Sequence, residues 1–340
     1  MSGTGRTRLR EVGEDSLLTR FRDLAAAALN DQVLVGPGDD AAVMRLADGR
    51  LLLLTCDMMV EEIHFRRAWA TPEQIGWKAM AQNLSDIAAM GGEPGFAVSS
   101  VAAPGDADRE VVEGIARGLI SCASNFGAVL VGGDLVGSRG PIVVDVAVTG
   151  FAEERLLLCR SGARPGEAIA VTGALGASAA GLAALRQGLA GDPDPQVVRA
   201  LRAHRQPVPR LAEGRAIAAS RRASAMMDLS DGLADDLPRL CASSAVGARV
   251  WLAQIPIDDS CEPLAAGIGT DPLALAVSGG EDYELLFTCE PAAAEEIRAA
   301  TGTRVTVIGE VVAGEGVVWI GADGAPVSVG RGFDHFAGAE

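Results

Sequence analysis

The chain has 340 residues and a formal net charge of −16, and 49% of its residues are hydrophobic. With 42 glycines and 16 prolines, it falls short of the roughly 25–30% glycine and proline that is typical of low-complexity chains. A chain this acidic, without a visible basic patch, is not expected to bind nucleic acid or an anionic membrane surface. At roughly 100–200 residues per domain, the length predicts about two domains.

The sequence also favours a location in the cytoplasm. No apolar run approaches the ~18 residues that a membrane span needs, and acidic residues follow Arg10 too soon for a signal-peptide core. The six cysteines are widely spaced and include no Cys-x-x-Cys pair, so we expect mainly buried free thiols rather than disulfides or a zinc site.

Strands and helices are expected to alternate along the first half of the chain, because apolar residues recur at helical or strand spacing between turn residues. The predicted helices cover 14–30, 71–90 and 106–125. The predicted strands cover 32–35, 51–55, 95–101, 128–131 and 141–151.

A polar connection over 152–166 separates the two halves, and we expect domains at 1–152 and 153–340. The second half is expected to alternate in the same way. The predicted strands cover 168–172, 224–227, 249–252 and 284–289, and helices are expected after Gly176, over 195–204 and 209–220, and from about Gly232. This pattern predicts an α/β architecture.

Aspartates recur where apolar strands end or glycine turns begin. They are Asp39, Asp40, Asp57, Asp134, Asp228 and Asp231, and Asp86 lies late in a predicted helix. Ligands of α/β sheets bind outside the carboxyl ends of the strands, and carboxylate oxygens suit magnesium, calcium or manganese rather than zinc. Each aspartate alone is explained by a turn, and Asp231 by a helix cap. Together they predict several divalent cations, because converging carboxylates repel one another.

Other motifs have a structural explanation beside a functional one. Gly173 and Gly176 could admit a phosphate to a helix N-terminus, although tight helix–strand packing is the simpler explanation. Tyr283, the only tyrosine, fits an aromatic residue packed on the core. His64 could touch an anionic substrate, although a lone histidine is more often structural. His204 is expected to be solvated among arginines.

Lys78 is the only lysine in the chain, and no Gly-Lys pair occurs. A P-loop requires Gly-Lys-Ser/Thr, and a protein kinase requires a lysine on a strand. Both nucleotide sites are therefore excluded, and phosphate charge would have to be neutralised in another way.

Taken together, the motifs resemble those of the thiamine-monophosphate kinase family, in the superfamily of aminoimidazole ribonucleotide synthetase. The matching segments, in order, are GPGDDAAV (36–43), TCDMMVEEIHF (55–65), NLSDIAAMGGEP (83–94), GGD (132–134), RSGARPGE (160–167), VTGALGASAAGL (171–182), MDLSDGLADDL (227–237), SGGEDYELLF (278–287) and GFDHF (332–336). The resemblance implies a two-domain fold with mixed sheets flanked by helices, assembled as a homodimer. It also implies that ATP, as co-substrate, phosphorylates thiamine monophosphate to thiamine diphosphate.

The resemblance further implies roles for individual residues. The magnesium ligands would be Asp40, Thr55, Cys56, Asp57, Asp86, Asp134, Asp228 and Asp231. ATP would contact Gly133, Asp134, Arg160 and Ser230, and the substrate would contact His64, Glu281 and Phe333. Asp57, Asp228 and Asp231 would matter most. No residue is assigned as nucleophile or base, since a phosphate acceptor is already deprotonated at neutral pH and direct in-line transfer needs neither.

Two positions depart from the family pattern. Cys56 stands where a hydroxyl residue is common, so it could serve magnesium only through its backbone carbonyl, or not at all. Phe333 could stack on the substrate rings but offers no hydrogen bond. The alternatives are another ATP-dependent synthetase of the superfamily, such as a selenophosphate synthetase, and a non-catalytic acidic metal-binding protein. A selenophosphate synthetase would be expected to have a lysine near the N-terminus, and none precedes Lys78.

Overall fold

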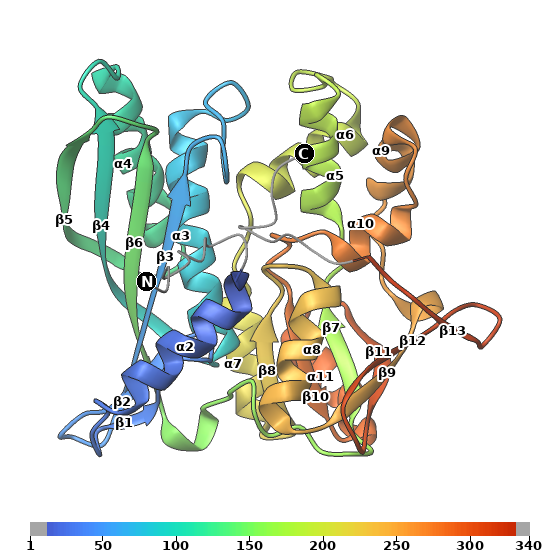
Figure 1. Cartoon of the computed structure of the whole chain (residues 1–340). Helices are drawn as coiled ribbons and strands as arrows, with labels where there is room; N and C mark the ends of the chain where they lie inside the picture. Colours follow the sequence, from blue (N-terminus) through green and yellow to red (C-terminus); the bar gives the residue numbers. More distant parts are fainter. Residues whose placement is uncertain (1–11, 331–340) are drawn as a thin grey trace, which may run out of the picture.

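The computed structural model describes residues 12–330, and its strands form two mixed sheets (Figure 1). The first sheet has the strand order β1-β2-β3-β6-β4-β5. Its strands are β1 (Val33–Val35), β2 (Ala42–Arg45), β3 (Leu51–Val60), β4 (Glu93–Pro104), β5 (Val129–Ser138) and β6 (Val143–Ala152). The helices of this half are α2 (Glu14–Ala26), α3 (Pro72–Ala89) and α4 (Arg109–Asn125).

The second sheet has the order β13-β12-β9-β11-β7-β10-β8. Its strands are β7 (Ala168–Thr172), β8 (Ala223–Asp228), β9 (Gly247–Trp251), β10 (Leu285–Cys289), β11 (Val305–Val312), β12 (Gly316–Ile320) and β13 (Pro326–Val327). The α-helices of this half are α5 (Ala177–Arg186), α6 (Pro195–Arg205), α7 (Leu211–Ser220), α8 (Leu233–Ser244), α9 (Cys261–Ile268), α10 (Pro272–Ser278) and α11 (Ala294–Thr301). The predicted fold of mixed sheets flanked by helices is confirmed.

Helix α3 lies between the two sheets, and its sequence accounts for both its limits and its burial (Figure 1). Thr71 and Gln74 form a capping box at its start, where Pro72 fits the first turn. Apolar side chains from α3, from the first sheet and from the near face of the second sheet form one core. The helix therefore fixes the polar side chains that it carries relative to both halves.

A pair of glycines brings α3 and α4 together. A Cβ atom on Gly76 would lie 2.0 Å from the carbonyl oxygen of Ile115, and one on Gly118 would lie 2.0 Å from that of Glu73. Both distances are too short for any side chain, so the two backbones are in direct contact at this crossing.

Two strands are longer than predicted, and this corrects part of the reasoning about strand ends. β3 continues past Asp57 to Val60, and β5 continues through Gly133 and Asp134 to Ser138. Pairing with β6 and β4 along their whole length outweighs the turn preference of aspartate and glycine. Asp57 and Asp134 therefore lie within strands, whereas Asp228 does end β8 as predicted.

One face of the first sheet is open on the side away from α3. Exposed apolar side chains follow β3, β4 and β5 on this open face: Leu54, Met58, Phe96, Val98, Val129 and Val136. β5 is also an edge strand, so its free backbone groups border the same surface. Among the described residues, no helix is long and apolar enough to cross a membrane.

Candidate active site

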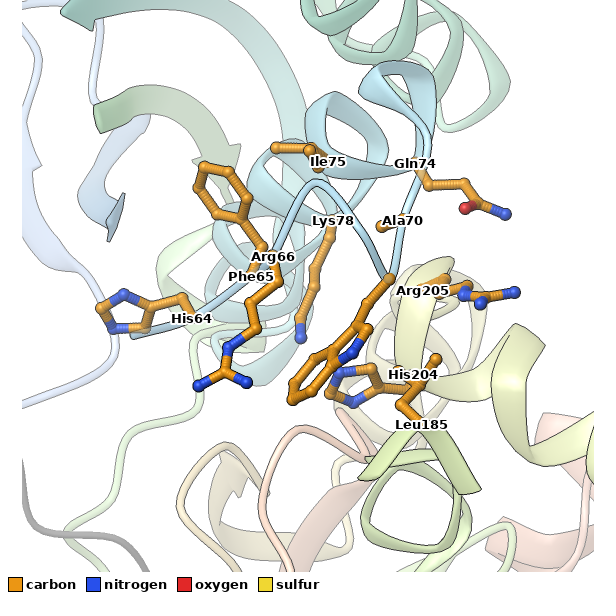
Figure 2. Close-up of a pocket in the computed structure, with 11 residues that line it drawn as sticks. His64, Phe65, Arg66, Ala70, Gln74, Ile75, Lys78, Leu185, His204 and Arg205 are labelled. Carbon is orange, nitrogen blue, oxygen red and sulfur yellow. The ribbon is translucent and has the colours of Figure 1, made fainter. Parts of the chain in front are cut away.

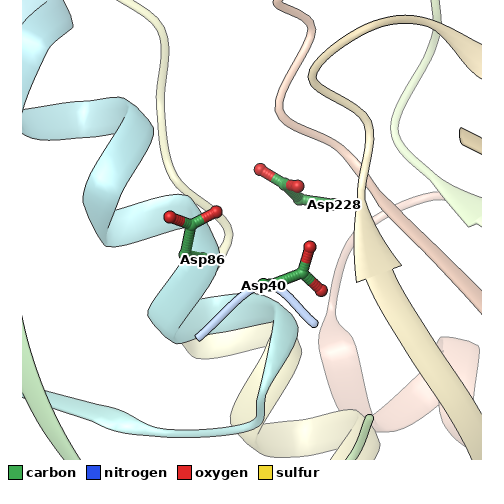
Figure 3. Close-up of side chains that lie close together, drawn as sticks. All are labelled: Asp40, Asp86 and Asp228. Carbon is green, nitrogen blue, oxygen red and sulfur yellow. The ribbon is translucent and has the colours of Figure 1, made fainter. Parts of the chain in front are cut away.

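Three predicted metal ligands converge between the two sheets. Asp40 comes from the turn before β2, Asp86 from α3 and Asp228 from the end of β8, and each offers an oxygen within 4.8 Å of the others (Figure 3). We call these three residues the acidic cluster. The sequence placed its members almost 190 positions apart, and the packing of α3 between the sheets joins them.

The acidic cluster is electrostatically unfavourable as it stands. Burial, followed by repulsion from neighbouring carboxylates, raises the pKa of Asp86 and of Asp228 well above its usual value. Burial likewise raises the pKa of Asp40, against the opposing effect of Arg160. The Oδ2 atom of Asp40 is buried without a hydrogen-bond partner among the described residues, which is costly unless a cation lies beside it.

Asp57 and Asp231 lie close enough to interact with the acidic cluster. Burial raises the pKa of Asp57 to about 6, with contributions from Asp231, Asp145 and Asp40. Asp231 accepts a hydrogen bond from Arg239. It does not cap α8, whose N-cap residue is Gly232 and which has no side-chain capping hydrogen bond. The carboxylate of Asp236 accepts the N–H groups of Asp231 and Gly232 at 3.0 Å each.

Two hydroxyl groups orient the cluster. The Oγ1 atom of Thr55 donates to Asp86 at 2.5 Å, and the Oγ atom of Ser85 donates to Asp228 at 2.5 Å. Ser85 was not predicted as a site residue, although it lies in the NLSD segment one position before Asp86. Because neighbours on a strand face opposite sides, the exposed thiol of Cys56 points away from Thr55 and from the cluster.

Arg160 is held against the turn that carries Asp40. Its guanidinium donates to Asp40 through both Nε, at 3.0 Å, and Nη2, while its backbone N–H donates to both oxygens of Asp39 at 3.1 Å. Arg160, the predicted ATP contact, is thus paired with Asp40, a predicted metal ligand. Asp39 has its pKa raised to about 6, mainly by burial and by Asp40.

Gly133 and Asp134 are not brought to the acidic cluster within one chain. The strand register places Asp57 on β3 in line with Gly133 on β5, with Val146 on β6 and Ser99 on β4 between them. Three strand spacings of ~4.8 Å therefore separate Asp57 from Gly133, about 14 Å in all. Asp134 is exposed on the edge strand and accepts from the N–H of Leu135.

Glu281, a predicted substrate residue, forms a charge pair with the buried Lys78. Glu281 accepts a hydrogen bond from Lys78 at 2.6 Å, and its Oε2 atom lies 3.4 Å from Nδ1 of His204. His64 lies nearby, where its positive form would lower the pKa of Glu281, and its Nδ1 accepts the N–H of Val60. Figure 2 shows Lys78, His204 and His64 around one small pocket. Phe333 lies outside the described residues.

The prediction that His204 is solvated was wrong. His204 is 8% exposed and shares a hydrogen bond of 3.1 Å with Ser178, because α6 packs against α5. Burial, followed by the charge of Lys78, lowers the pKa of His204 to about 3. The residue is therefore neutral at physiological pH, and the arginines around it in sequence do not indicate its environment.

The N-terminus of α5, which follows the glycine turn, is already occupied by a side chain of the protein. The carboxylate of Asp282 accepts the N–H groups of Gly176 and Ser178 at 2.6 and 3.1 Å. A Cβ atom on Gly176 would lie 2.9 Å from the backbone nitrogen of Ala276. Close packing explains this turn, as the simpler interpretation held, and Tyr283 is buried as expected.

Comparison with protein families agrees with this geometry. Residues 38–152 match the N-terminal domain of AIR synthase related proteins, and residues 164–321 match the C-terminal domain of the same proteins. The chain therefore belongs to the AIR synthase related proteins, whose two domains supply the two halves of the acidic cluster described above.

Curated relatives and solved structures narrow the family. Thiamine-monophosphate kinase of Escherichia coli (strain K12) is 37% identical over 338 residues, covering 96% of this chain and 98% of the relative. The enzyme of Mycobacterium tuberculosis (strain H37Rv) is 38% identical over 279 residues, covering 82% and 81%. The solved structure of AaThiL complexed with AMPPCP and TMP has a TM-score of 0.85 at 32% identity, covering 98% of this chain and all of that one. The chain is a member of the thiamine-monophosphate kinase family.

Proposed function

We propose that this chain transfers the γ-phosphoryl group of ATP directly to the phosphate of thiamine monophosphate, with several Mg²⁺ ions held at the acidic cluster. The single observation that carries the proposal is the convergence of Asp40, Asp86 and Asp228 from both halves of the chain. The names of the relatives and the ligands of AaThiL support the two substrates.

The donor set fits Mg²⁺. It consists of carboxylate and hydroxyl oxygens, the ligands that a hard cation prefers, and the unpartnered Oδ2 atom of Asp40 is the kind of atom that a cation would satisfy. The residues that would hold the ions are Asp40, Thr55, Asp57, Asp86, Asp228 and Asp231, with Cys56 limited to its carbonyl. When bound, such ions neutralise the charge that builds up on the transferring phosphoryl group.

The residues of the chain would then position the two anions. Arg160 would turn from Asp40 toward ATP once a cation takes its place, since guanidinium groups bind phosphate in a forked manner. Ser230 would contact ATP from the loop after β8. No general base is assigned, because the attacking phosphate oxygen carries no proton that must be removed.

The thiamine part of the substrate would lie beside Glu281. This residue lines a cleft of about 650 Å³, a size that fits a small organic ligand. The Oγ atom of Ser278 donates to the carbonyl oxygen of Gly330 at 2.9 Å, which ties the chain three residues before Phe333 to the loop that carries Glu281. As the resemblance implies, Phe333 and His64 would complete the contacts to the substrate.

The assay that tests the function mixes the protein with ATP, MgCl₂ and thiamine monophosphate and follows thiamine diphosphate. We expect product with thiamine monophosphate and none with thiamine. ATP turnover only with a different acceptor would favour another synthetase of the superfamily. Absence of nucleotide binding in the presence of magnesium would favour a non-catalytic metal-binding protein.

We further propose a homodimer that covers the open face of the first sheet. The exposed apolar residues of that face form the kind of surface that marks a protein interface. Gly133 lies about 14 Å from Asp57 along the sheet of one chain. If Asp134 and Gly133 serve the ATP site as predicted, a second copy is the means by which they would reach it.

Mixing two inactive variants tests this arrangement. Asp134→Asn and Asp57→Asn are each expected to be inactive alone. Refolded together, they are expected to regain about a quarter of the wild-type activity, as random pairing gives one intact shared site in half of the dimers. No recovery, despite mixed dimers, would place Asp134 outside the active site of its partner.

Two broader assignments belong to the same proposal. We divide the chain into functional units at residues 152 and 153, supported by the sheet boundary there. We place the protein in the cytoplasm, where ATP is available, and the six free thiols are consistent with a reducing compartment.

A further inference from the structure

Lys78 is a buried charge whose partner lies in the other half of the chain. It is 4% exposed although it belongs to α3, and its Nζ atom donates to Oε2 of Glu281 at 2.6 Å. In Figure 2 its ammonium group extends from α3 toward His204 and the second half of the molecule. A buried ammonium group is costly unless a carboxylate compensates it, so the contact with Glu281 is a specific requirement of this position.

The backbone of Glu281 is fixed independently of Lys78. Its φ angle is +66°, an uncommon value for a residue other than glycine, and its N–H donates to the carbonyl oxygen of Ser230 at 2.7 Å. A Cβ atom on the preceding Gly280 would lie 2.5 Å from that same oxygen. The loop is thus pressed against Ser230, and only the direction of the Glu281 side chain remains to be set.

The other groups that face this carboxylate do not replace Lys78. His204 is neutral for the reasons given above, and it shares its Nδ1 atom with the hydroxyl of Ser178. Although burial alone would raise the pKa of Glu281, Lys78 is the largest of the influences that lower it. Lys78 is therefore the principal cation that keeps the carboxylate charged and turned in one direction.

We propose that Lys78 is a positioning residue for thiamine monophosphate: by holding Oε2 of Glu281 across the two halves, it presents Oε1 to the cationic part of the substrate. Among the described residues, no hydrogen bond to Oε1 is seen, and Glu281 lines the cleft of about 650 Å³. The proposal rests on the proposed function, in which Glu281 contacts the substrate. Lys78 itself touches no substrate and acts only through Glu281.

Kinetic constants of Lys78→Met and Lys78→Arg test the proposal. For Lys78→Met we expect the KM for thiamine monophosphate to rise at least about tenfold, the scale seen when an orienting partner is lost. Its kcat and its KM for ATP should stay within about twofold of wild type, and Lys78→Arg should recover most of the KM. Equal losses in kcat and in both KM values would indicate a merely structural role and would overturn the proposal.

Arg117→Met serves as the matched control. It removes a cation from an ion pair with Glu73, which also belongs to α3 but lies at the surface. We expect it to leave both KM values unchanged, since it has no connection to Glu281. A similar rise in KM for this variant would show that any disturbance of α3 suffices, which would contradict a specific role for Lys78.

A double-mutant cycle separates this proposal from the proposed function. Glu281→Gln should raise the KM for thiamine monophosphate, and adding Lys78→Met to it should cause no further rise, because the two residues act as one unit. If the KM of the double variant instead rises by the product of the two single effects, the role of Lys78 would be overturned while the substrate contact of Glu281 would stand. An unchanged KM in Glu281→Gln would overturn the substrate contact and the role of Lys78 together. The double variant buries no unpaired charge, so it remains informative even if Lys78→Met folds poorly.

Discussion

Each carboxylate of the acidic cluster has one polar partner of its own. Thr55 serves Asp86, Ser85 serves Asp228 and Arg160 serves Asp40. These partners fix the orientation of the carboxylates, but they do not neutralise the cluster, because only Arg160 carries a charge. In a metal site, the protein is expected to orient the carboxylates while the bound cation neutralises their charge. The acidic cluster has this arrangement.

Asp57→Asn should separate catalysis from folding. The amide keeps the size of the side chain but removes one charge from a group of mutually repelling carboxylates. We expect kcat to fall at least about 100-fold, the scale of losing one group that stabilises transition-state charge. The melting temperature without divalent ions should stay the same or rise. Steady-state assays and thermal unfolding with and without MgCl₂ measure both effects, and a large fall in the melting temperature would identify Asp57 as structural.

His204 should make the folded state sensitive to acid. Its pKa is about 3 in the folded protein and about 6.5 in an unfolded chain, so between these values the unfolded state binds more protons. The free energy of unfolding should therefore decrease as the pH falls from about 6.5 toward 3, by at most about 1.4 kcal/mol per pH unit from this residue.

His204→Gln removes that contribution while keeping a polar partner for Ser178. Urea unfolding of both proteins between neutral pH and about pH 4 gives the comparison. The advantage of wild type over the variant should shrink as the pH falls. If the difference in free energy of unfolding between the two proteins stays constant over this range, His204 is protonated as readily in the folded state as in the unfolded state, which would contradict the prediction.

Among the elements, α3 contributes most to the site. It carries Lys78, Ser85 and Asp86 and contacts both sheets, and its crossing with α4 depends on Gly76 and Gly118. Glycine disfavours a helix by roughly 1 kcal/mol relative to alanine. Its presence at both positions is explained by the close approach of the two backbones rather than by helix preference.

Gly118→Ala should therefore destabilise the protein despite the better helix propensity of alanine. The new methyl group would meet the carbonyl oxygen of Glu73 at 2.0 Å, and overpacking of this kind costs typically 1–3 kcal/mol. Chemical denaturation measures the loss. Gly105→Ala is the control, because a Cβ atom there has nothing within 4 Å, and equal effects of the two substitutions would rule out the packing argument.

The sequence predicted the long elements well, since their periodicity and caps are local signals. It missed β2, the short helices α9 to α11 and the strands β11 to β13, whose residues are few or only partly buried. It also ended β3 and β5 too early, because the sheet partners that extend these strands are distant in sequence. For the same reason the aspartates and Glu281 could be named from the sequence, whereas their partners could not: Ser85 and Arg239 for the aspartates, and Lys78 for Glu281. The separation of Asp134 from the acidic cluster could not be predicted either.

At the scale of the whole molecule, the open face of the first sheet is exposed apolar surface that a second copy could cover. Val98→Lys places a charge in the middle of this face, where Val98 is 46% exposed. We expect wild type to be a dimer and the variant to be a monomer, because burying an unpaired charge opposes association.

Light scattering after gel filtration distinguishes the two states. Val318→Lys is the control, as this valine is 44% exposed on β12 of the other sheet. We expect it to leave the dimer intact. A wild-type monomer at micromolar concentration would contradict the proposed assembly.

The division of the acidic cluster between the two halves has a consequence for synthesis of the chain. Asp40 and Asp86 leave the ribosome early, whereas Asp228 follows only after β8 has been made. A truncated or still growing polypeptide that ends before this residue lacks the third carboxylate, and so cannot assemble the proposed magnesium site. Incomplete products of translation would therefore consume no ATP, and phosphoryl transfer would begin only once the second half has folded against the first.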